Sequence, residues 1–474
     1  MTRRSARALV FTTSAAVLVL EILAGRLLAP FVGVSLETFT GIIGTILAGI
    51  ALGSGVGGKM ADHRPPSTMI GPAISLGGVL AWGSLPIVTA TGPAFGNGPM
   101  AIVLVSALAF FLPACVLSAV SPMVAKLRLS DLGETGEVVG GLSAAGTLGA
   151  LFGTFFTGFV LVSAVPTRPV IIGLGGLLVV LGVAIGVRLG GAKPDLMMAT
   201  IGVATLAAAA LSSSPCEFET AYFCGSVIED AERPSIRVLE LDDLRHAAID
   251  LDDPTWLEFR YTNLIADVVD AMPAGTVTAL HVGGGGFTMP RYVEATRPGS
   301  DSLVLEIDPF LVDVAKDELG LVTSDRLRVE VGDARLAVDD IEAGVYDIVV
   351  GDAFASVAVP WHLTTREFVA EIARSLKPDG IYVMNVIDGG ESHFARAELA
   401  TLASEFEHVG AIIPPDGVRE RPVNQILLAS QLPLPALDID GEHGVLVDDV
   451  DAYIDGARVL TDDFAPVDWL TRDR

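Results

Sequence analysis

Three acidic residues stand where apolar, β-prone segments end, and they carry the clearest chemical meaning in the sequence. Glu306, Asp333 and Asp352 close the segments 302–305, 327–331 and 346–351. In an open parallel sheet, ligands bind outside the carboxyl ends of the strands, so these acids should converge on one site. Carboxylates placed there can hold ribose hydroxyls, attract a cation and accept a proton.

Four successive glycines, Gly283 to Gly286, follow an earlier apolar segment. Glycines let the backbone approach a ligand that side chains would exclude, and a carboxylate about 20 residues further on can accept both ribose hydroxyls. Glu306 lies 23 residues after Gly283, with a helix-length segment between them. The pattern predicts a nucleoside-type ligand that is bound by Gly283, Gly285, Glu306 and Asp308.

The first 213 residues have the composition of a membrane domain. Seven apolar segments are mostly long enough to cross a hydrocarbon core of about 30 Å: residues 8–30, 39–61, 68–92, 98–125, 139–163, 167–188 and 195–213. The first is too long for a cleavable signal peptide, and more spans follow it. We therefore predict a helical transmembrane domain of about seven spans at residues 1–213.

The remaining residues alternate strand and helix patterns. Two strands at 220–228 and 236–241 predict a small β-element within residues 214–256. Residues 257–474 then predict an α/β Rossmann-like domain, similar to the class I methyltransferases. In this domain we expect a helix at 365–376, a turn at Lys377-Pro378-Asp379-Gly380 and a strand at 381–387, the turn being indicated by its proline and glycine.

Charge divides the chain at the same place. Residues 1–213 hold 11 of the 30 Lys and Arg residues and 7 of the 57 Asp and Glu residues, so residues 214–474 carry a net charge of −31. This acidity argues against a nucleic-acid partner and suits a small cationic substrate. No CxxC motif or His/Cys cluster indicates a metal, and the sequence leaves open whether the chain forms a homo-oligomer.

Lys and Arg residues gather in alternate loops of the membrane half. One set of loops holds Arg3, Arg4, Arg7, Lys59, Arg64, Lys126, Arg128, Arg188 and Lys193, whereas the opposite loops offer little beyond Arg168. By the positive-inside rule the N-terminus is cytoplasmic in a multi-pass protein of the cell membrane. An odd number of spans places the acidic domain outside the cell, and one span fewer returns it inside, so the side stays open.

Two cysteines, Cys216 and Cys224, flank the start of the acidic half, and Cys115 lies in a predicted span. A disulfide between the first two would suit an exported domain. Because two cysteines do not make a disulfide framework, two small buried side chains are the favoured interpretation. Glu21 and Arg26 lie at membrane depth five positions apart, so they do not share a helix face well and direct pairing is not expected.

The motifs of both halves resemble the spermidine synthase family, the polyamine aminopropyltransferases, and specifically its membrane-fused members. The soluble resemblance rests on HVGGGGF, VLEIDP, GDAR, YDIVVGDAF with HLTTREF, ELDDLRHAAID and LTDDFAPVDWL, and the membrane resemblance on EILAGRLLAP and LGSGVGGKMAD. It implies decarboxylated S-adenosylmethionine as donor and a diamine such as putrescine as acceptor.

The resemblance also implies a role for each site residue. Glu306 would hold the ribose, Asp333 and Ala334 the adenine, and Asp352 would be the catalytic acid at the reacting amine. The residues implied on the acceptor side are Tyr261, His246, Asp462 and Asp463. A sulfonium is already a good leaving group, so the reaction needs mainly orientation and an unprotonated amine.

The chain departs from the family pattern in three places. Gly286 or Phe287 stands where the family has an acid, Tyr261-Thr262-Asn263 replaces YHE, and residues 353–359 lack a second acid. Two further functions therefore remain open. One is a methyltransferase that uses ordinary S-adenosylmethionine, and the other is a polyamine transporter or sensor whose soluble domain binds without turnover.

Overall fold

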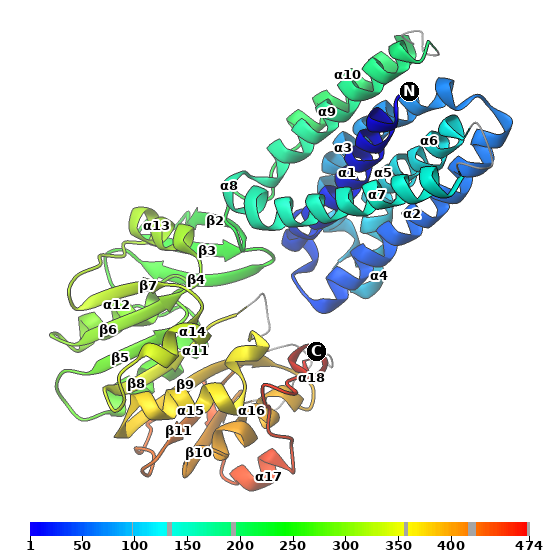
Figure 1. Cartoon of the computed structure of the whole chain (residues 1–474). Helices are drawn as coiled ribbons and strands as arrows, with labels where there is room; N and C mark the ends of the chain where they lie inside the picture. The colour runs from blue at the N-terminus through cyan, green and yellow to red at the C-terminus, as the bar shows by residue number, and fades with distance from the viewer. Residues whose placement is uncertain (97, 130–134, 191–195, 355–358, 416–422, 472–474) are drawn as a thin grey trace. The chain divides into compact units, whose positions relative to one another are not determined.

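The computed structural model describes residues 1–96, 98–129, 135–190, 196–354, 359–415 and 423–471. The chain divides into two compact units, Met1–Gly225 and Ser226–Arg474, and Figure 1 shows the elements of each. Each unit is described separately.

The first unit is a bundle of long apolar helices. Its elements are α1 (Arg3–Val32), α2 (Leu36–His63), α3 (Pro66–Phe95), α4 (Pro99–Ser106), the π-helix η1 (Ala107–Phe111), α5 (Leu112–Ser118), α6 (Val120–Arg128), α7 (Thr135–Phe156), the π-helix η3 (Thr157–Leu161), α8 (Val162–Ala164), α9 (Thr167–Arg188) and α10 (Leu196–Leu211). Among the described residues, six continuous helical stretches are long and apolar enough to cross a membrane, and the seventh, Met197–Leu211, is shorter.

Glycines on α2 and α7 bring helices into close contact, as their four-residue spacing predicts. A Cβ atom at Gly53 would lie 2.0 Å from the Cys115 carbonyl oxygen of α5, and one at Gly149 would lie 2.2 Å from the Phe11 carbonyl oxygen of α1. Only hydrogen fits at such distances, so the small residues allow the backbones to meet.

A four-stranded sheet follows the bundle along the chain, in the order β1-β2-β3-β4. Its strands are β1 (Phe218–Glu219), β2 (Cys224–Glu229), β3 (Ile236–Leu241) and β4 (Leu244–Asp250). The sequence predicted only two strands here. It missed β4 because the polar pair Asp242-Asp243 interrupts the apolar pattern, whereas in the structure Asp242 takes a left-handed conformation (φ 53°) and turns the chain.

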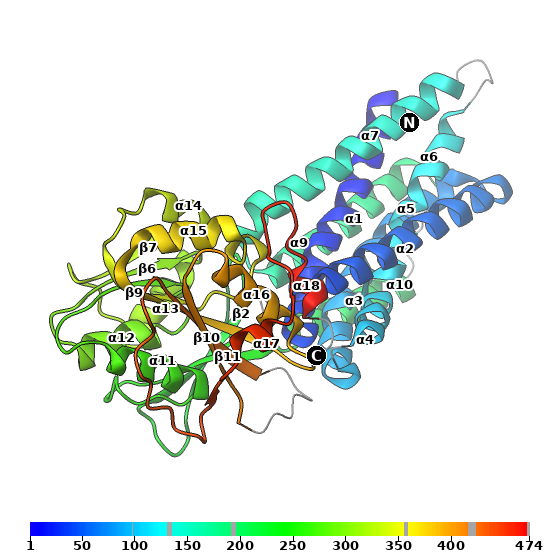
Figure 2. The ribbon, with the colours of Figure 1, turned by 90° about the horizontal axis from the view of Figure 1, so that it is seen from below.

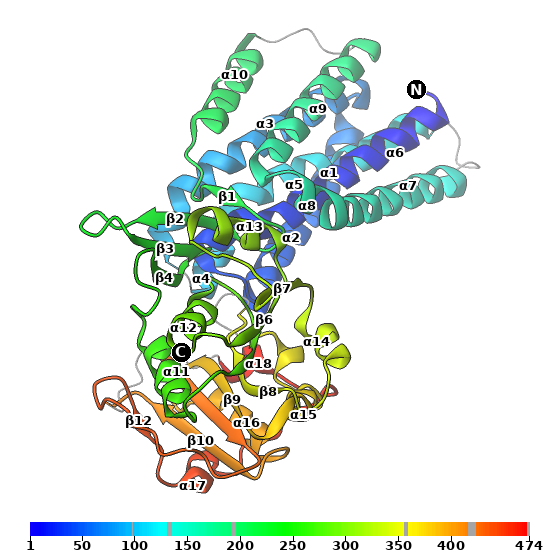
Figure 3. The ribbon, with the colours of Figure 1, turned by 90° about the vertical axis from the view of Figure 1, so that its left-hand side faces the viewer.

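The second unit contains an eight-stranded mixed sheet in the order β12-β10-β11-β9-β8-β5-β6-β7. Figure 3 shows β12 beside β10 at one edge of this sheet. Its strands are β5 (Thr278–Val282), β6 (Asp301–Glu306), β7 (Leu327–Val331), β8 (Tyr346–Gly351), β9 (Leu376–Asp388), β10 (His408–Ile413), β11 (Val423–Ser430) and β12 (Val445–Leu446). Strands β5 to β9 pair in parallel, and β11 joins β9 and β10 in antiparallel pairs. This is a Rossmann-like α/β arrangement.

Helices cover both faces of this sheet, as Figure 2 shows from another side. They are α11 (Arg260–Ala271), α12 (Thr288–Thr296), α13 (Pro309–Glu318), α14 (Ala334–Ala337), α15 (Arg366–Ser375), α16 (His393–Ala403), α17 (Val450–Ile454) and α18 (Val467–Leu470). One core contains residues of α11 and α12 together with Ala279, and the other contains residues of α15 and α16 together with Leu280. Neighbouring residues of β5 thus enter opposite cores, as the two-residue period of a strand requires.

One predicted turn is wrong. Lys377-Pro378-Asp379-Gly380 does not precede the strand but lies inside β9, which begins at Leu376. The pairing between β8 and β9 shifts between Tyr346 and Ile348, so that Tyr346 faces Leu376 while Ile348 faces Ile381. This irregularity absorbs the proline and glycine, which a regular central strand would not accept.

Candidate active site

The carboxyl ends of β5, β6, β7 and β8 are joined by backbone hydrogen bonds. The Gly283 amide donates to the Leu305 carbonyl at 2.9 Å, the Gly332 amide to the Glu306 carbonyl at 2.9 Å, and the Asp352 amide to the Val282 carbonyl at 2.9 Å. The sheet therefore brings the glycine run, Glu306, Asp333 and Asp352 to one edge.

The glycine run passes tightly over the end of β8. Gly283 has φ 96°, and a Cβ atom built there would lie 2.4 Å from the Asp352 carbonyl oxygen. Phe287 is left-handed (φ 56°), and its ring is fully buried beneath Gly284, whose built Cβ would lie 2.7 Å from Cζ. The positive φ and the close approach both exclude side chains, so Gly283 is required by the shape of the loop.

Glu306 holds the glycine loop in place. Its Oε2 accepts the amides of Gly284 at 2.8 Å and Gly285 at 3.3 Å, and its Oε1 accepts the Asp308 amide at 2.9 Å. Burial raises the pKa of Glu306, and the three amide donors oppose that rise. A carboxylate offers about four acceptor sites, and the amides occupy two on Oε2 and one on Oε1, so Oε1 retains capacity for a ribose hydroxyl.

Asp308 begins α13 by accepting the Phe310 amide at 3.0 Å through Oδ1. The side chain is 1% exposed, and its Oδ2 has no hydrogen-bond partner among the described residues. A buried acceptor without a partner costs free energy, so this oxygen next to Glu306 suits a ligand hydroxyl.

Asp333 and Ala334 lie at the start of α14. The Asp333 Oδ1 accepts the Arg335 amide at 2.9 Å, and the His362 Nε2 lies 3.4 Å from the same oxygen. Ala334 is buried. A small apolar surface beside a capping acid is compatible with a flat base, because the base can pack on the methyl group while the backbone and the acid meet its edge.

Asp352 is half-buried at the end of β8 and is held by two side chains. The Asn385 Nδ2 of β9 donates to its Oδ1 at 2.8 Å, and the Tyr261 hydroxyl of α11 also hydrogen-bonds to it. Burial raises the pKa of Asp352 to about 6, against the lowering effect of these two donors. A fixed carboxylate that titrates near 6 can accept a proton close to neutral pH.

Tyr261 is bound to Asp352, but the other residues expected on the acceptor side have different surroundings. The Asp462 Oδ2 accepts a hydrogen bond from Arg335 at 2.7 Å, and its Oδ1 accepts one from the Thr365 hydroxyl at 2.6 Å. Asp463 is exposed. His246 lies on β4, where burial lowers its pKa to about 4, so it is neutral at pH 7. Their substrate roles stay predictions.

Asn385 is a site residue that the sequence reasoning missed, and Asn424 supports it. The Asn424 Nδ2 of β11 donates to the Asn385 Oδ1 at 3.0 Å, which orients the Asn385 amide towards Asp352. Asn385 is 2% exposed in an otherwise apolar segment, IYVMNVI. A lone polar residue within a buried strand needs a partner, and that signal could have identified it.

Other residues of the chain occupy or contact the positions at which it departs from the family pattern. A Cβ atom at Gly286 would lie 2.3 Å from the Ala247 Cβ of β4, so Ala247 fills the space that a side chain at this position would need. The Asn263 Nδ2 donates to the Leu257 and Phe259 carbonyl oxygens and so caps the chain entering α11. The segment 355–358, within the stretch that lacks the second acid, lies outside the described residues.

A cavity of about 640 Å³ lies beside the tail of this unit and differs in character from the predicted site. Its lining includes His393, Arg396, Arg458, Phe464 and Trp469. Its two arginines are balanced by Glu391 and Asp455 in the same lining, so the cavity offers no net negative charge to attract a polycation and we do not assign the acceptor to it. No group of three or more His, Cys, Asp or Glu residues that could hold a metal occurs within the described ranges.

Comparison with known proteins points to one family of transferases. Residues 258–415 match the family described as "Spermine/spermidine synthase domain". A polyamine aminopropyltransferase of Vibrio vulnificus is 30% identical over 208 residues, covering 40% of this chain and 69% of the relative. A polyamine aminopropyltransferase of Bacillus cereus is 31% identical over 130 residues, covering 27% of this chain and 47% of that relative.

A solved structure of a probable spermidine synthase from Corynebacterium glutamicum is 26% identical to this chain, with a TM-score of 0.49. The similarity covers 53% of this chain and 97% of that one.

Proposed function

The chain belongs to the spermidine synthase family and is a transferase, and from this premise we propose that it transfers an aminopropyl group from decarboxylated S-adenosylmethionine to a small amine such as putrescine. We further propose that its first unit anchors it in a lipid bilayer. The observation that carries the catalytic proposal is Asp352, held by Tyr261 and Asn385 beside the glycine loop.

In the proposed reaction, the acceptor nitrogen attacks the propyl carbon next to the donor's sulfonium. The new C–N bond forms as the C–S bond breaks. The electron pair of the C–S bond stays on the sulfur, which becomes a neutral thioether. Asp352 orients the attacking amine and takes the proton that the nitrogen loses. A positioned base of this kind contributes about 10²–10⁴ in rate.

The donor's nucleoside would be held along the sheet edge. Glu306 and the Asp308 Oδ2, which has no hydrogen-bond partner in the described part of the chain, would accept the ribose hydroxyls. Asp333 with Ala334 would meet the adenine. The loop amides of Gly284 and Gly285 already fix the Glu306 carboxylate, so the ribose acceptor is oriented in advance.

Membrane anchoring is supported by the surface of the first unit. Its long helices expose large apolar side chains to their surroundings, including Leu47, Phe155, Phe159, Val180 and Val203. Water-soluble domains rarely expose so many together, whereas a hydrocarbon solvent favours them. Sodium carbonate extraction of membranes should leave the protein in the pellet.

Product formation by the purified protein tests the catalytic proposal. We expect Asp352→Asn to lower kcat/KM about 10²–10⁴-fold, because the amide cannot accept the proton. The matched control is Asp325→Asn, an exposed acid in the loop before β7, which should retain activity. Turnover by Asp352→Asn at the wild-type rate would contradict the assignment.

A methyltransferase remains a second candidate because of Gly286. This position has no acidic side chain to meet the donor's amino group, and Ala247 occupies the adjoining space. Titration calorimetry with the decarboxylated and the ordinary donor separates the two functions. Preference for the ordinary donor, together with methyl transfer, would favour the methyltransferase.

A further inference from the structure

The chain crosses the helical bundle again after α9. It leaves α9 at Arg188, yet Arg168, the second residue of the same helix, donates to the Ala209 carbonyl at 2.9 Å and to the Ser212 hydroxyl at 3.3 Å. The helix α10 therefore ends beside the start of α9, whose 22 residues span about 33 Å. Although α10 is shorter than the other spans, it completes a seventh crossing.

The neighbours of α10 support this direction. A Cβ atom at Gly202 would lie 3.5 Å from the Val79 side chain, and one at Gly83 would lie 3.7 Å from Thr205. The residue numbers in the two contacts increase together along both helices, so α10 runs parallel to α3. In contrast, Gly71 lies near Gly186 and Gly78 near Gly175, so α9 runs antiparallel to α3.

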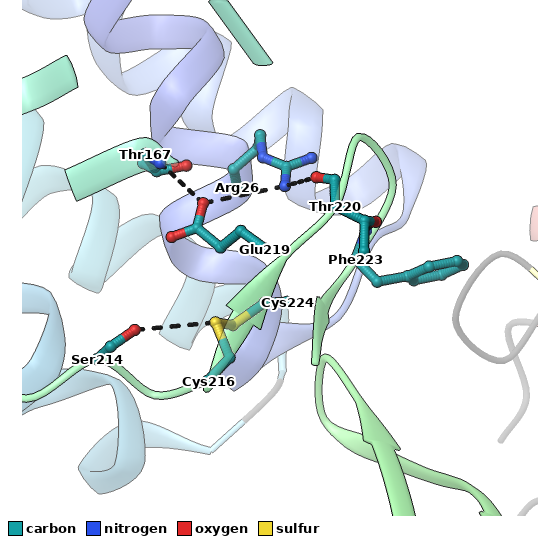
Figure 4. Close-up of a disulfide and its surroundings, with 8 residues drawn as sticks. All are labelled: Arg26, Thr167, Ser214, Cys216, Glu219, Thr220, Phe223 and Cys224. Atoms are coloured by element: carbon teal, nitrogen blue, oxygen red, sulfur yellow. Dashed lines mark hydrogen bonds and ion pairs between the residues drawn. A yellow bond between two sulfur atoms is a disulfide. The ribbon is translucent and has the colours of Figure 1, made fainter. Parts of the chain in front are cut away.

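The segment after α10 is fixed to the end of the bundle where α9 begins, as Figure 4 shows. Arg26, near the end of α1, donates to the carbonyl oxygens of Thr220 and, at 2.7 Å, Ala221. The Glu219 Oε2 accepts the Thr167 amide at 2.8 Å and lies 4.0 Å from the Arg26 guanidinium. Arg26 thus pairs with Glu219 rather than with Glu21.

A disulfide joins Cys216 to Cys224 in this docked segment (Figure 4), which corrects the expectation of two unpaired buried thiols. The two residues are close because β1 and β2 form a hairpin in which Glu219 faces Cys224. Disulfides form and persist in oxidising compartments and are rare in the cytosol.

The opposite end of the bundle carries most of its basic residues. There Arg3 binds Glu137, Lys126 lies 2.8 Å from Asp62, and Arg128 donates to the Met1 carbonyl at 3.0 Å. Arg4, Arg7, Lys59, Arg64 and Arg188 lie at the same helix ends. At the disulfide end, Arg26 and Arg168 are instead committed to carbonyl oxygens of residues 209–221.

We propose that the Cys216–Cys224 disulfide lies outside the cytoplasm, and that the transferase unit which follows it acts on an amine on that side. This inference rests on the membrane anchoring proposed above. The seventh crossing puts the segment opposite the basic end, and the positive-inside rule makes the basic end cytoplasmic. The disulfide independently indicates an oxidising compartment. The two thiols would give up two electrons and two protons to the disulfide of an extracytoplasmic oxidoreductase, which is thereby reduced to a dithiol.

Labelling of the full chain in cells tests the proposal. In a background where Cys115, Cys216 and Cys224 are replaced by serine, one reporter cysteine is introduced, either Ala343→Cys on an exposed loop of the transferase unit or Arg64→Cys between α2 and α3. With a membrane-impermeant maleimide we expect Ala343→Cys to label in intact cells as fully as after permeabilisation. Arg64→Cys should label only after permeabilisation, and the reverse pattern would overturn the proposal.

A second measurement keeps the native cysteines, in case their removal prevents folding. Free thiols are blocked in intact cells, and the protein is then denatured and reduced. The thiols that reduction releases are alkylated with a reagent that adds a known mass to each cysteine. Tags on both Cys216 and Cys224 support the inference, and blocking of both without reductant overturns it. Carbonate extraction of the same cells is read separately, since release of the protein would refute the membrane anchor itself.

Discussion

At the scale of single residues, the chemistry centres on a carboxylate whose pKa is set by competing neighbours. Burial raises the pKa of Asp352 to about 6, while the donors Asn385 and Tyr261 stabilise its ionised form. In turn, burial and, after it, the negative charge of Asp352 raise the pKa of the Tyr261 hydroxyl, so Tyr261 remains a donor throughout the working range. Asp352 is thus ionised above pH 6 and ready to accept a proton from an amine.

The acid limb of the pH–rate profile should report this group. We expect kcat/KM to rise through about pH 6 as Asp352 ionises. Asn385→Ala removes a donor that lowers this pKa, so the limb should move to higher pH. Asn424→Ala removes the donor to the Asn385 Oδ1, on the other side of the amide from Asp352, and should move the limb less. Identical limbs in wild type and Asn385→Ala would show that Asn385 does not tune Asp352.

Glu398 supplies a second test at this scale, on stability. It is fully buried in α16, both of its carboxyl oxygens lack a hydrogen-bond partner among the described residues, and burial raises its pKa well above the ordinary value. The folded protein keeps the proton while the unfolded chain loses it above about pH 4.3, so stability is full below that pH and is lost as pH rises towards the folded pKa.

Glu398→Gln removes the ionisation and should therefore gain stability relative to wild type as pH rises from 5 to 8, by about 1 kcal/mol or more. Thermal unfolding of the full chain in detergent at several pH values measures the difference. The exposed acid Glu342 offers the control Glu342→Gln, which should show no such trend. A constant difference between Glu398→Gln and wild type at every pH would contradict the expectation.

At the scale of elements, the accuracy of the sequence predictions follows from how local each signal is. The strands β5 to β8 and their terminal acids were predicted well because apolar runs, glycines and acids lie next to one another in the chain. The turn at Lys377-Pro378 was misplaced because a shift in pairing with β8 absorbs it, and that shift depends on the partner strand. The Asp462–Arg335 pair joins residues 127 positions apart, which no local pattern reveals.

The close packing of α2 gives a matched prediction for one helix. Gly53→Ala should destabilise the bundle by about 1–3 kcal/mol, because the added methyl group would meet the Cys115 carbonyl. Gly55→Ala adds the same group where nothing lies within 4 Å, so it should be neutral or stabilising by about 0.5–1 kcal/mol through helix propensity. Detergent thermostability by size-exclusion chromatography measures both, and equal effects would refute the contact.

At the scale of the whole molecule, charge is divided unequally between the two halves of the chain. Residues 214–474 carry −31, while the helical half is mildly positive. A field of this sign raises the local concentration of cations and speeds their association, and added salt screens it over a Debye length of about 8 Å at physiological ionic strength.

We therefore expect KM for a di- or polyamine to rise with ionic strength while kcat stays nearly constant. Steady-state kinetics at low and at physiological salt, with a neutral osmolyte as control, measures the effect. A KM that does not respond to salt would show that the acidity serves solubility alone.

The buried ring of Phe287 has a consequence for how tightly ligands can bind. The glycine loop is moulded on this ring and tied to Glu306, so its shape comes from the chain's own contacts. A nucleoside analogue that fits this loop therefore loses little binding free energy to ordering a flexible segment. The affinities of rigid analogues should then follow how well their shapes match the loop. Removing the Phe287 ring, as in Phe287→Gly, should lower the affinity of every analogue by a similar entropic cost.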